Sequence, residues 1–357
     1  AAEMRTALIK KLGAHGGHSG PNLGFVEATV ALHYVFDSPD DKMVFDVSHQ
    51  TYCHKMLTGR AQAFYDPAHY DDVSGYSNPK ESDHDLFTIG HTSTSVSLAA
   101  GLAKARDLAG RKENVIAVIG DGSLSGGEAL EGLDFIGEQK TNFILVVNDN
   151  EMSIAENHGG LYENLGLLRE TDGKAERNLF KAMGLDYIYV ADGNDVKALI
   201  KAFEGVKDYP RPIAVHIHTV KGKGLAFAEQ NPEKYHAGGP FDIKTGKYLY
   251  DSDEKDYGDI VSDYLLEKMK KDASVVAITS GTPSVFGFTP EKRKKAGKQF
   301  VDVGIAEETA AALASGIAKN GGKPVWGVFS TFVQRTYDQI SQDICINKSP
   351  VTVLVFG

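Results

Sequence analysis

Two short polar motifs, each directly after an apolar run, have the residue types to bind a divalent cation together with phosphate groups. They are Gly120-Asp121-Gly122 and Asn148-Asp149-Asn150. Because the carboxyl ends of parallel strands meet at one edge of a sheet, we expect the Asp121 carboxylate and the Asn150 amide to converge, as a hard divalent cation requires. The glycines let phosphates approach the backbone, and a helix starting near Ser123 offers free N–H groups. Each motif alone is better explained as a common turn or loop, but their pairing favours a site.

Three histidines are predicted at loops or strand ends, where a side chain can reach a ligand. His18 lies in a glycine-rich stretch, 13–24, that we expect to be a loop, and His49 follows a short strand. His91 precedes hydroxyl residues that can cap the next helix. A single histidine at a strand end is more often structural than catalytic. Three in a domain that also carries the cation motif favour a functional role.

A second group of candidate residues lies in the last third of the chain. Glu307 follows an apolar strand and begins a helix, where the helix dipole alone would favour an acidic residue. Phe332 and Arg335 follow the next strand. Phe332 can stack on a ring or belong to the core, and Arg335 can bind a phosphate or pair on the surface. The residues themselves leave both alternatives open.

The elements that must position these residues alternate between strand and helix along the chain. This pattern predicts an α/β protein with two consecutive open, mainly parallel sheets, the second incomplete. We expect a first domain at 1–224, a linker at 225–256 and a second domain at 257–357. Because the sequence starts within an amphipathic helix and stops after a strand, we also expect it to be a piece of a longer protein.

Composition excludes several classes of protein. The net charge of −10 without a basic stripe argues against nucleic-acid binding, and no apolar span is long enough for a membrane helix. Cys53 and Cys345 have no metal-ligand spacing, so we expect reduced thiols in a cytoplasmic protein. A nicotinamide dehydrogenase is disfavoured because no G-x-G-x-x-G with a later acidic residue follows a first strand.

From end to end the chain resembles the 1-deoxy-D-xylulose-5-phosphate synthase family, thiamine diphosphate enzymes related to transketolase. The segments that carry the resemblance are HSGPNLG, VFDVSHQTYCHKMLTGR, GHTSTS, IGDGSLSGG, VVNDNEMSI, VKGKG, IAEE and STFVQRTYDQ. The resemblance implies that pyruvate loses carbon dioxide and that the remaining two-carbon unit joins D-glyceraldehyde 3-phosphate. It also implies thiamine diphosphate and Mg²⁺ as cofactors, and a homodimer.

The resemblance gives each candidate residue a role. The metal ligands would be Asp121, Asn150 and the main-chain carbonyl of Met152. Glu307 would activate the cofactor, while His49 and His18 would transfer protons around the substrate. The residues expected to contact the cofactor are His49, His91, Gly122, Ser123, Asn150, Lys221 and, by stacking on the pyrimidine, Phe332. Arg335 would face the phosphate of the acceptor.

The sequence departs from the family pattern at three places. Glu308-Thr309 stands where the family usually has Gln-His, and the segment after the metal loop is shorter than usual. The family's Asp-Arg after the last strand is not evident, since the sequence reads Val355-Phe356-Gly357. Alternatives therefore stay open: transketolase-like ketol transfer, a paralogue with another acceptor, or a non-catalytic cofactor-binding fragment.

Overall fold

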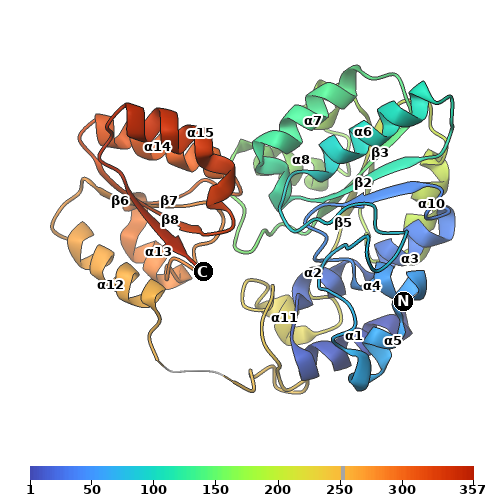
Figure 1. The fold of residues 1–357 in the computed structure, drawn as a ribbon, viewed down its shortest axis with the longest axis horizontal. Helices are drawn as coiled ribbons and strands as arrows, with labels where there is room; N and C mark the ends of the chain where they lie inside the picture. The colour runs from blue at the N-terminus through green and yellow to red at the C-terminus, as the bar shows by residue number, and fades with distance from the viewer. Residues whose placement is uncertain (251–253) are drawn as a thin grey trace. The chain divides into compact units, whose positions relative to one another are not determined.

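The computed structural model describes residues 1–250 and 254–357, which form two compact units (Figure 1). The first unit comprises residues 1–124, 128–152 and 160–250, and the second comprises residues 125–127, 153–159 and 254–357. Each unit has its own parallel β-sheet. The expected α/β class with two consecutive parallel sheets is confirmed.

The first sheet has five parallel strands in the order β1-β2-β3-β5-β4. Its central strands are apolar throughout because both faces are covered: Ile116 and Val118 enter one hydrophobic cluster, while Ala117 and Ile119 enter another. The strands are β1 (Lys42–Phe45), β2 (Val115–Gly120), β3 (Phe143–Asp149), β4 (Asp186–Val190) and β5 (Pro212–His218).

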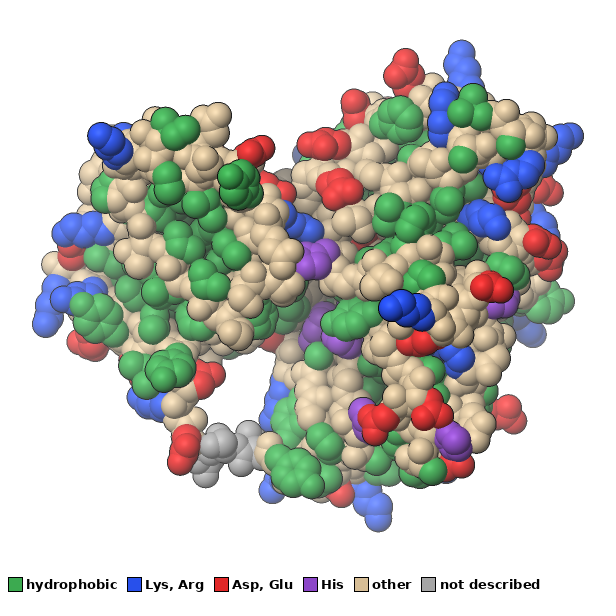
Figure 2. Space-filling model, viewed as in Figure 1, with side chains coloured by type: hydrophobic (Ala, Val, Ile, Leu, Met, Phe, Trp, Pro, Cys, Tyr) green, Lys and Arg blue, Asp and Glu red, His purple; other side chains and the backbone are tan. Residues whose placement is uncertain are grey.

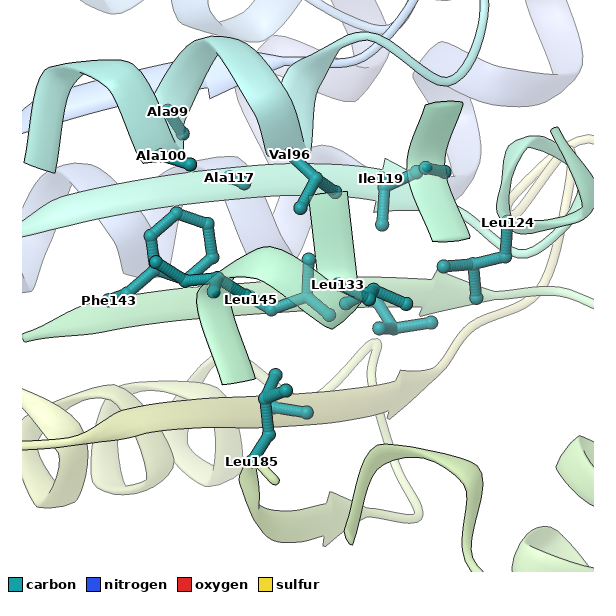
Figure 3. Packing of buried hydrophobic residues seen from close by; sticks show 14 of the residues in the cluster. Val96, Ala99, Ala100, Ala117, Ile119, Leu124, Leu133, Phe143, Leu145 and Leu185 are labelled. Atoms are coloured by element: carbon teal, nitrogen blue, oxygen red, sulfur yellow. The ribbon is translucent and has the colours of Figure 1, made fainter. Parts of the chain in front are cut away.

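Helices cover both faces of this sheet. On one face Val96, Ala99 and Ala100 of α6 pack with side chains of β2 and β3 (Figure 3). The helices that contribute to this cluster are α6 (Ser95–Leu108), α7 (Gly127–Glu138), α8 (Gly160–Glu170) and α9 (Leu179–Ala182). On the other face α3 (Val26–Val35) and α10 (Val196–Val206) pack together.

A third hydrophobic cluster in the first unit corrects the expected linker at 225–256. Leu225, Tyr235 and Phe241 are buried in this cluster, so residues 225–250 pack into the first unit. Their aromatic side chains bury too much apolar surface for an exposed connection. The helices around the cluster are α1 (Ala2–His15), α2 (Ser19–Gly24), α4 (Tyr52–Lys55), α5 (Gln62–Tyr65) and α11 (Ala226–Gln230).

The second sheet has four parallel strands in the order β7-β6-β8-β9. They are β6 (Val275–Thr279), β7 (Phe300–Asp302), β8 (Lys323–Phe329) and β9 (Thr352–Phe356). One hydrophobic cluster joins Phe286 and Phe288 with α12 (Tyr257–Met269) and α13 (Pro290–Ala296), and the other joins Trp326 with α14 (Glu307–Lys319).

Two stretches differ from the sequence prediction. The glycine-rich stretch 13–24 is mostly helical, because α1 continues to His15 and α2 begins at Ser19. Gly16 and Gly17, with φ of 82° and 128°, make the turn between these helices. The alternation of strands and helices also predicts a helix at 331–345, but this stretch is irregular. It consists of a 3₁₀ turn (Val333–Thr336), the short α15 (Tyr337–Gln339) and a π-helix (Ile340–Ile346).

On the face shown in Figure 2, acidic and basic side chains are interspersed over the surface. Within residues 1–250 and 254–357, no helix combines the length and apolar character needed to cross a membrane. Both cysteines are free thiols, with Cys53 buried and Cys345 exposed.

Candidate active site

The carboxyl ends of β2 and β3 lie side by side, which brings the two polar motifs together. Gly120 pairs with Asn148 in the parallel register, and the Asp121 N–H donates to the Asn148 carbonyl over 3.1 Å. Asp121 is buried. Asn150 Oδ1 is also buried and has no hydrogen-bond partner among the described residues. A 3₁₀ turn, Gly122–Ser125, follows Asp121 directly.

Asp46, at the end of β1, holds the loop that carries His91. Its two carboxylate oxygens accept hydrogen bonds from the backbone N–H groups of Ser93 (2.8 Å) and Ser95 (2.9 Å). Ser93 Oγ donates to the Ser123 carbonyl over 2.9 Å, which links the loop to the turn after β2. Burial raises the pKa of Asp46, although the hydrogen bonds from Ser95 and Ser93 oppose this. The loop that carries His91 is thus hydrogen-bonded to the end of β1 and to the turn that carries Ser123.

Three histidines, His18, His49 and His236, form a ring cluster in the first unit. Their ring centroids are 5.2 Å (His18–His49), 5.4 Å (His49–His236) and 6.1 Å (His18–His236) apart. In all three the Nδ1 atom is buried and has no hydrogen-bond partner within the described part of the chain. Such groups are costly unless they serve a ligand.

Asn22 joins the backbones of two of these histidines. Its Nδ2 donates to the carbonyl oxygens of His18 (2.8 Å) and His49 (2.7 Å), and its Oδ1 accepts from the Tyr52 N–H (3.0 Å). Asn22 is almost fully buried in α2. The Asn22 amide therefore links the backbones of His18 and His49.

Burial keeps the three histidines neutral. It lowers the pKa of His18 to about 4, and it holds the pKa values of His49 and His236 well below their ordinary value with help from neighbouring positive groups, Lys221 among them. A neutral imidazole can accept a proton, so these side chains have the state required of a general base at neutral pH.

Lys221 is buried at the turn after β5 and lies beside the glycine-rich segment of α2. A Cβ on Gly20 would lie 3.0 Å from the Tyr235 carbonyl oxygen and 3.1 Å from Lys221 Cε, so a larger residue would crowd this approach. Burial lowers the pKa of Lys221 to about 8, against the charges of Asp121 and Glu233, which raise it. A cationic side chain influenced by Asp121 is suited to contact an anionic ligand.

Glu307 is the first residue of α14 in the second unit, and it is only 2% exposed. Burial raises the pKa of Glu307 to about 7, against the opposing charge of Arg335, whose Nη1 lies 3.4 Å from Glu307 Oε2. The long contact explains why the pairing does not outweigh burial. A carboxyl group half-protonated at neutral pH can exchange a proton with a ring nitrogen.

Phe332 and Arg335 lie in the same unit as Glu307. Phe332 is partly buried against the cluster that contains Trp326, and it packs edge-to-face on Phe329 at 5.4 Å. Its stacking on a cofactor stays a prediction. So does a contact between Arg335 and a phosphate.

The buried polar atoms of the first unit that have no partner among the described residues fit a polar ligand with a metal ion. Asn150 Oδ1 and the Nδ1 atoms of His18, His49 and His236 are buried acceptors or donors to which the described residues supply no partner. A Cβ on Gly120 would meet nothing within 4 Å, which leaves the backbone accessible. Within residues 1–250 and 254–357, no three His, Cys, Asp or Glu side chains could hold a metal by themselves. A metal held by Asp121 and Asn150 would therefore need ligand oxygens as well.

The sequence interpretation missed two residues of this arrangement. His236 lies in the segment predicted to be a linker. The aromatic residues around it could have indicated that this segment is buried, because they are too apolar for an exposed connection. Asn22 lies within a segment predicted to be a loop. Its role depends on contacts between distant segments, so no local pattern marks it.

Comparisons with known proteins define the class. A family model described as "Transketolase, thiamine diphosphate binding domain" matches residues 89–274. One described as "Transketolase, pyrimidine binding domain" matches residues 253–357. The chain therefore belongs to the transketolase family of thiamine diphosphate-binding proteins. Transketolases from Campylobacter jejuni (TM-score 0.54, 18% identity, 99% of this chain and 68% of that one) and Leishmania mexicana (0.51, 16%, 99% and 67%) share the fold.

Within this family the chain is similar to synthases. A model described as 1-deoxy-D-xylulose-5-phosphate synthase matches residues 1–176. Proteins of that name from Symbiobacterium thermophilum and Caldanaerobacter subterraneus are each 42% identical over 99% of this chain. The chain spans 60% and 62% of the length of these two relatives.

Proposed function

We propose that this chain carries the cofactor-binding part of a 1-deoxy-D-xylulose-5-phosphate synthase. The reaction removes carbon dioxide from pyruvate and joins the remaining two-carbon unit to D-glyceraldehyde 3-phosphate, with thiamine diphosphate and Mg²⁺ as cofactors. The observation that carries the proposal is the cluster of His18, His49 and His236, with buried unpartnered Nδ1 atoms, in the unit that also contains the paired polar motifs.

The first unit supplies the groups for the diphosphate and the metal. Asp121, the Asn150 amide and the main-chain carbonyl of Met152 would hold Mg²⁺, a hard cation that prefers such oxygen ligands. Gly122 and Ser123 present backbone N–H groups at the start of a turn. His91 and Lys221 add side-chain contacts to the cofactor.

In the proposed reaction, the histidines and Glu307 transfer protons. Thiamine diphosphate, when bound, supplies an electron sink that stabilises a carbanion. Glu307, whose pKa is raised to about 7, would hold or release a proton at its carboxyl group beside the aminopyrimidine ring. His18 and His49, neutral at pH 7, move protons around the substrate. Phe332 would stack on the pyrimidine, and Arg335 would bind the acceptor's phosphate. We also expect a homodimer, which sedimentation velocity would reveal.

The proposal is tested by carbon dioxide release from carboxyl-labelled pyruvate. The full-length protein in which this sequence occurs is assayed with thiamine diphosphate and Mg²⁺, with and without D-glyceraldehyde 3-phosphate. We expect release that increases when the aldehyde is added. Cofactor binding without release from pyruvate would overturn the proposal, and consumption of a ketose phosphate donor in its place would favour ketol transfer.

The metal assignment is tested by Asp121→Asn. This change removes the one carboxylate in the proposed ligand set, so we expect the Mg²⁺ concentration for half-maximal cofactor binding to rise at least tenfold, which is about 1.4 kcal/mol. Asp134→Asn, on the exposed side of α7, removes the same charge and should leave the requirement unchanged. A wild-type requirement in Asp121→Asn would contradict the assignment.

A further inference from the structure

One arginine bonds to the residues on both sides of Asn150. Arg169, near the end of α8, places Nη1 2.5 Å from Asp149 Oδ2 and Nη2 3.1 Å from Glu151 Oε2. The planar guanidinium can make both contacts at once because its N–H groups have a fixed fork geometry. Asn150 is therefore held between two carboxylates that share one cation.

Asp149 is anchored from several further elements. It is fully buried, and its Oδ2 lies 2.8 Å from His216 Nε2 of β5. The other ring nitrogen of His216 lies 2.8 Å from the hydroxyl of Tyr187 in β4. Contacts from α8, β4 and β5 thus converge on the end of β3. A buried network whose members are paired in this way is rigid.

The backbone after Asn150 has a conformation that needs such support. Glu151 has a φ of 66°, in the left-handed region that non-glycine residues rarely adopt. Its N–H donates to Asp149 Oδ1 over 3.1 Å, and its Oε1 lies 3.1 Å from His218 Nε2. Residues in such conformations persist where the surroundings hold them, commonly at functional sites.

We propose that Arg169 is a positioning residue that holds the backbone of 150–152 in the conformation that binds Mg²⁺. The inference rests on the proposed metal ligands Asn150 and Met152. α8 follows the metal loop directly in the chain, so the segment after the loop supplies the cation that contacts both carboxylates. Lysine cannot replace Arg169 fully, because a single ammonium group does not span both carboxylates in a fixed geometry.

The test is a titration of the protein with MgCl₂ at saturating thiamine diphosphate. The shift in melting temperature at each MgCl₂ concentration reports Mg²⁺ binding. Removing a residue that orients a metal ligand typically weakens metal affinity 10- to 100-fold. We expect an increase of that size in the apparent Mg²⁺ dissociation constant for Arg169→Met, and a smaller increase for Arg169→Lys and Glu151→Gln. Lys174→Met is the matched control, since it breaks an exposed pair with Asp172 (3.2 Å) in the same segment.

High Mg²⁺ separates positioning from general stabilisation. If Arg169 positions the loop, excess MgCl₂ restores cofactor binding to the wild-type level in Arg169→Met, whereas a merely structural defect persists. Should Arg169→Met fail to fold, Glu151→Gln carries the test, because the Glu151 side chain is 54% exposed. Wild-type Mg²⁺ affinity in the folded variants overturns the inference.

Asp121→Asn in the same titration distinguishes failure of the positioning role from failure of the proposed metal site. Loss of Mg²⁺ affinity in Asp121→Asn, with wild-type affinity in the Arg169 and Glu151 variants, overturns the positioning role alone. Wild-type affinity in Asp121→Asn overturns the proposed metal site, and the inference fails with it.

Discussion

At the scale of single residues, Glu307 has a property that the sequence did not indicate. Burial raises its pKa to about 7 from 4.5, so between these values the folded protein binds more protons than the unfolded chain. The stability contributed by the protonated carboxyl is complete below pH 4.5 and is lost as pH rises through about 7. The loss is on the order of 3 kcal/mol. Glu307→Gln, which mimics the protonated form, should lack this loss.

The measurement is the free energy of urea unfolding without cofactor, from pH 4.5 to 8, for wild type and Glu307→Gln. We expect the variant to match wild type at the acid end and to become the more stable protein above pH 7. Glu308→Gln removes the same charge one residue later and should retain most of the wild-type pH dependence. Parallel curves for wild type and Glu307→Gln would show that Glu307 has an ordinary pKa.

At the scale of elements, the turn after β1 joins His49 to the loop that carries His91. Val47 and Ser48 have φ values of 56° and 67°, both in the left-handed region. Ser48 Oγ donates to the Ile89 carbonyl (3.0 Å) and accepts from the Ser77 N–H (2.9 Å). With the two bonds that Asp46 accepts, these contacts hold a turn that a β-branched residue such as Val47 disfavours.

Asp46→Asn tests this turn. The new amide group would face one of the two backbone N–H donors that the carboxylate now satisfies, and a buried unpaired donor costs about 1–3 kcal/mol. We expect that loss in the free energy of urea unfolding, together with faster hydrogen exchange at Ser93 and Ser95. Asp40→Asn, an exposed residue before the same strand, should change neither. Unchanged exchange in Asp46→Asn would mean that the loop is held by other contacts.

The sequence predicted the regular strands and the residues next to them, because apolar runs and the polar groups at their carboxyl ends are local signals. This reasoning alone predicted that Asp121 and Asn150 lie at the same edge of the sheet, and the register of β2 and β3 agrees. Reasoning from local patterns did not find His236, Asn22 or Arg169. Each makes contacts outside its own helix or turn, and His236 and Asn22 lie in segments predicted to be a linker and a loop. Such contacts depend on how segments pack, which periodicity does not encode.

At the scale of the whole molecule, each unit has its own sheet and its own hydrophobic clusters, which is the condition for a domain to fold by itself. Phe143 and Phe286 are fully buried, the first in the cluster beneath α6 and the second in the cluster beside α12. Truncating either to alanine removes about 3–5 kcal/mol from its own core.

Differential scanning calorimetry of Phe143→Ala and Phe286→Ala tests whether the two cores are separate cooperative units. We expect two unfolding transitions in the wild type, since proteins with several domains commonly depart from two-state behaviour. Each variant should lower one transition and leave the other within about 1 °C, because a lost packing contact affects only the cooperative unit that contains it. A single transition lowered by both variants would show that the two cores unfold together. The proposed reaction would then depend on the stability of the whole molecule, and a defect in either core would reduce both cofactor binding and Glu307 function.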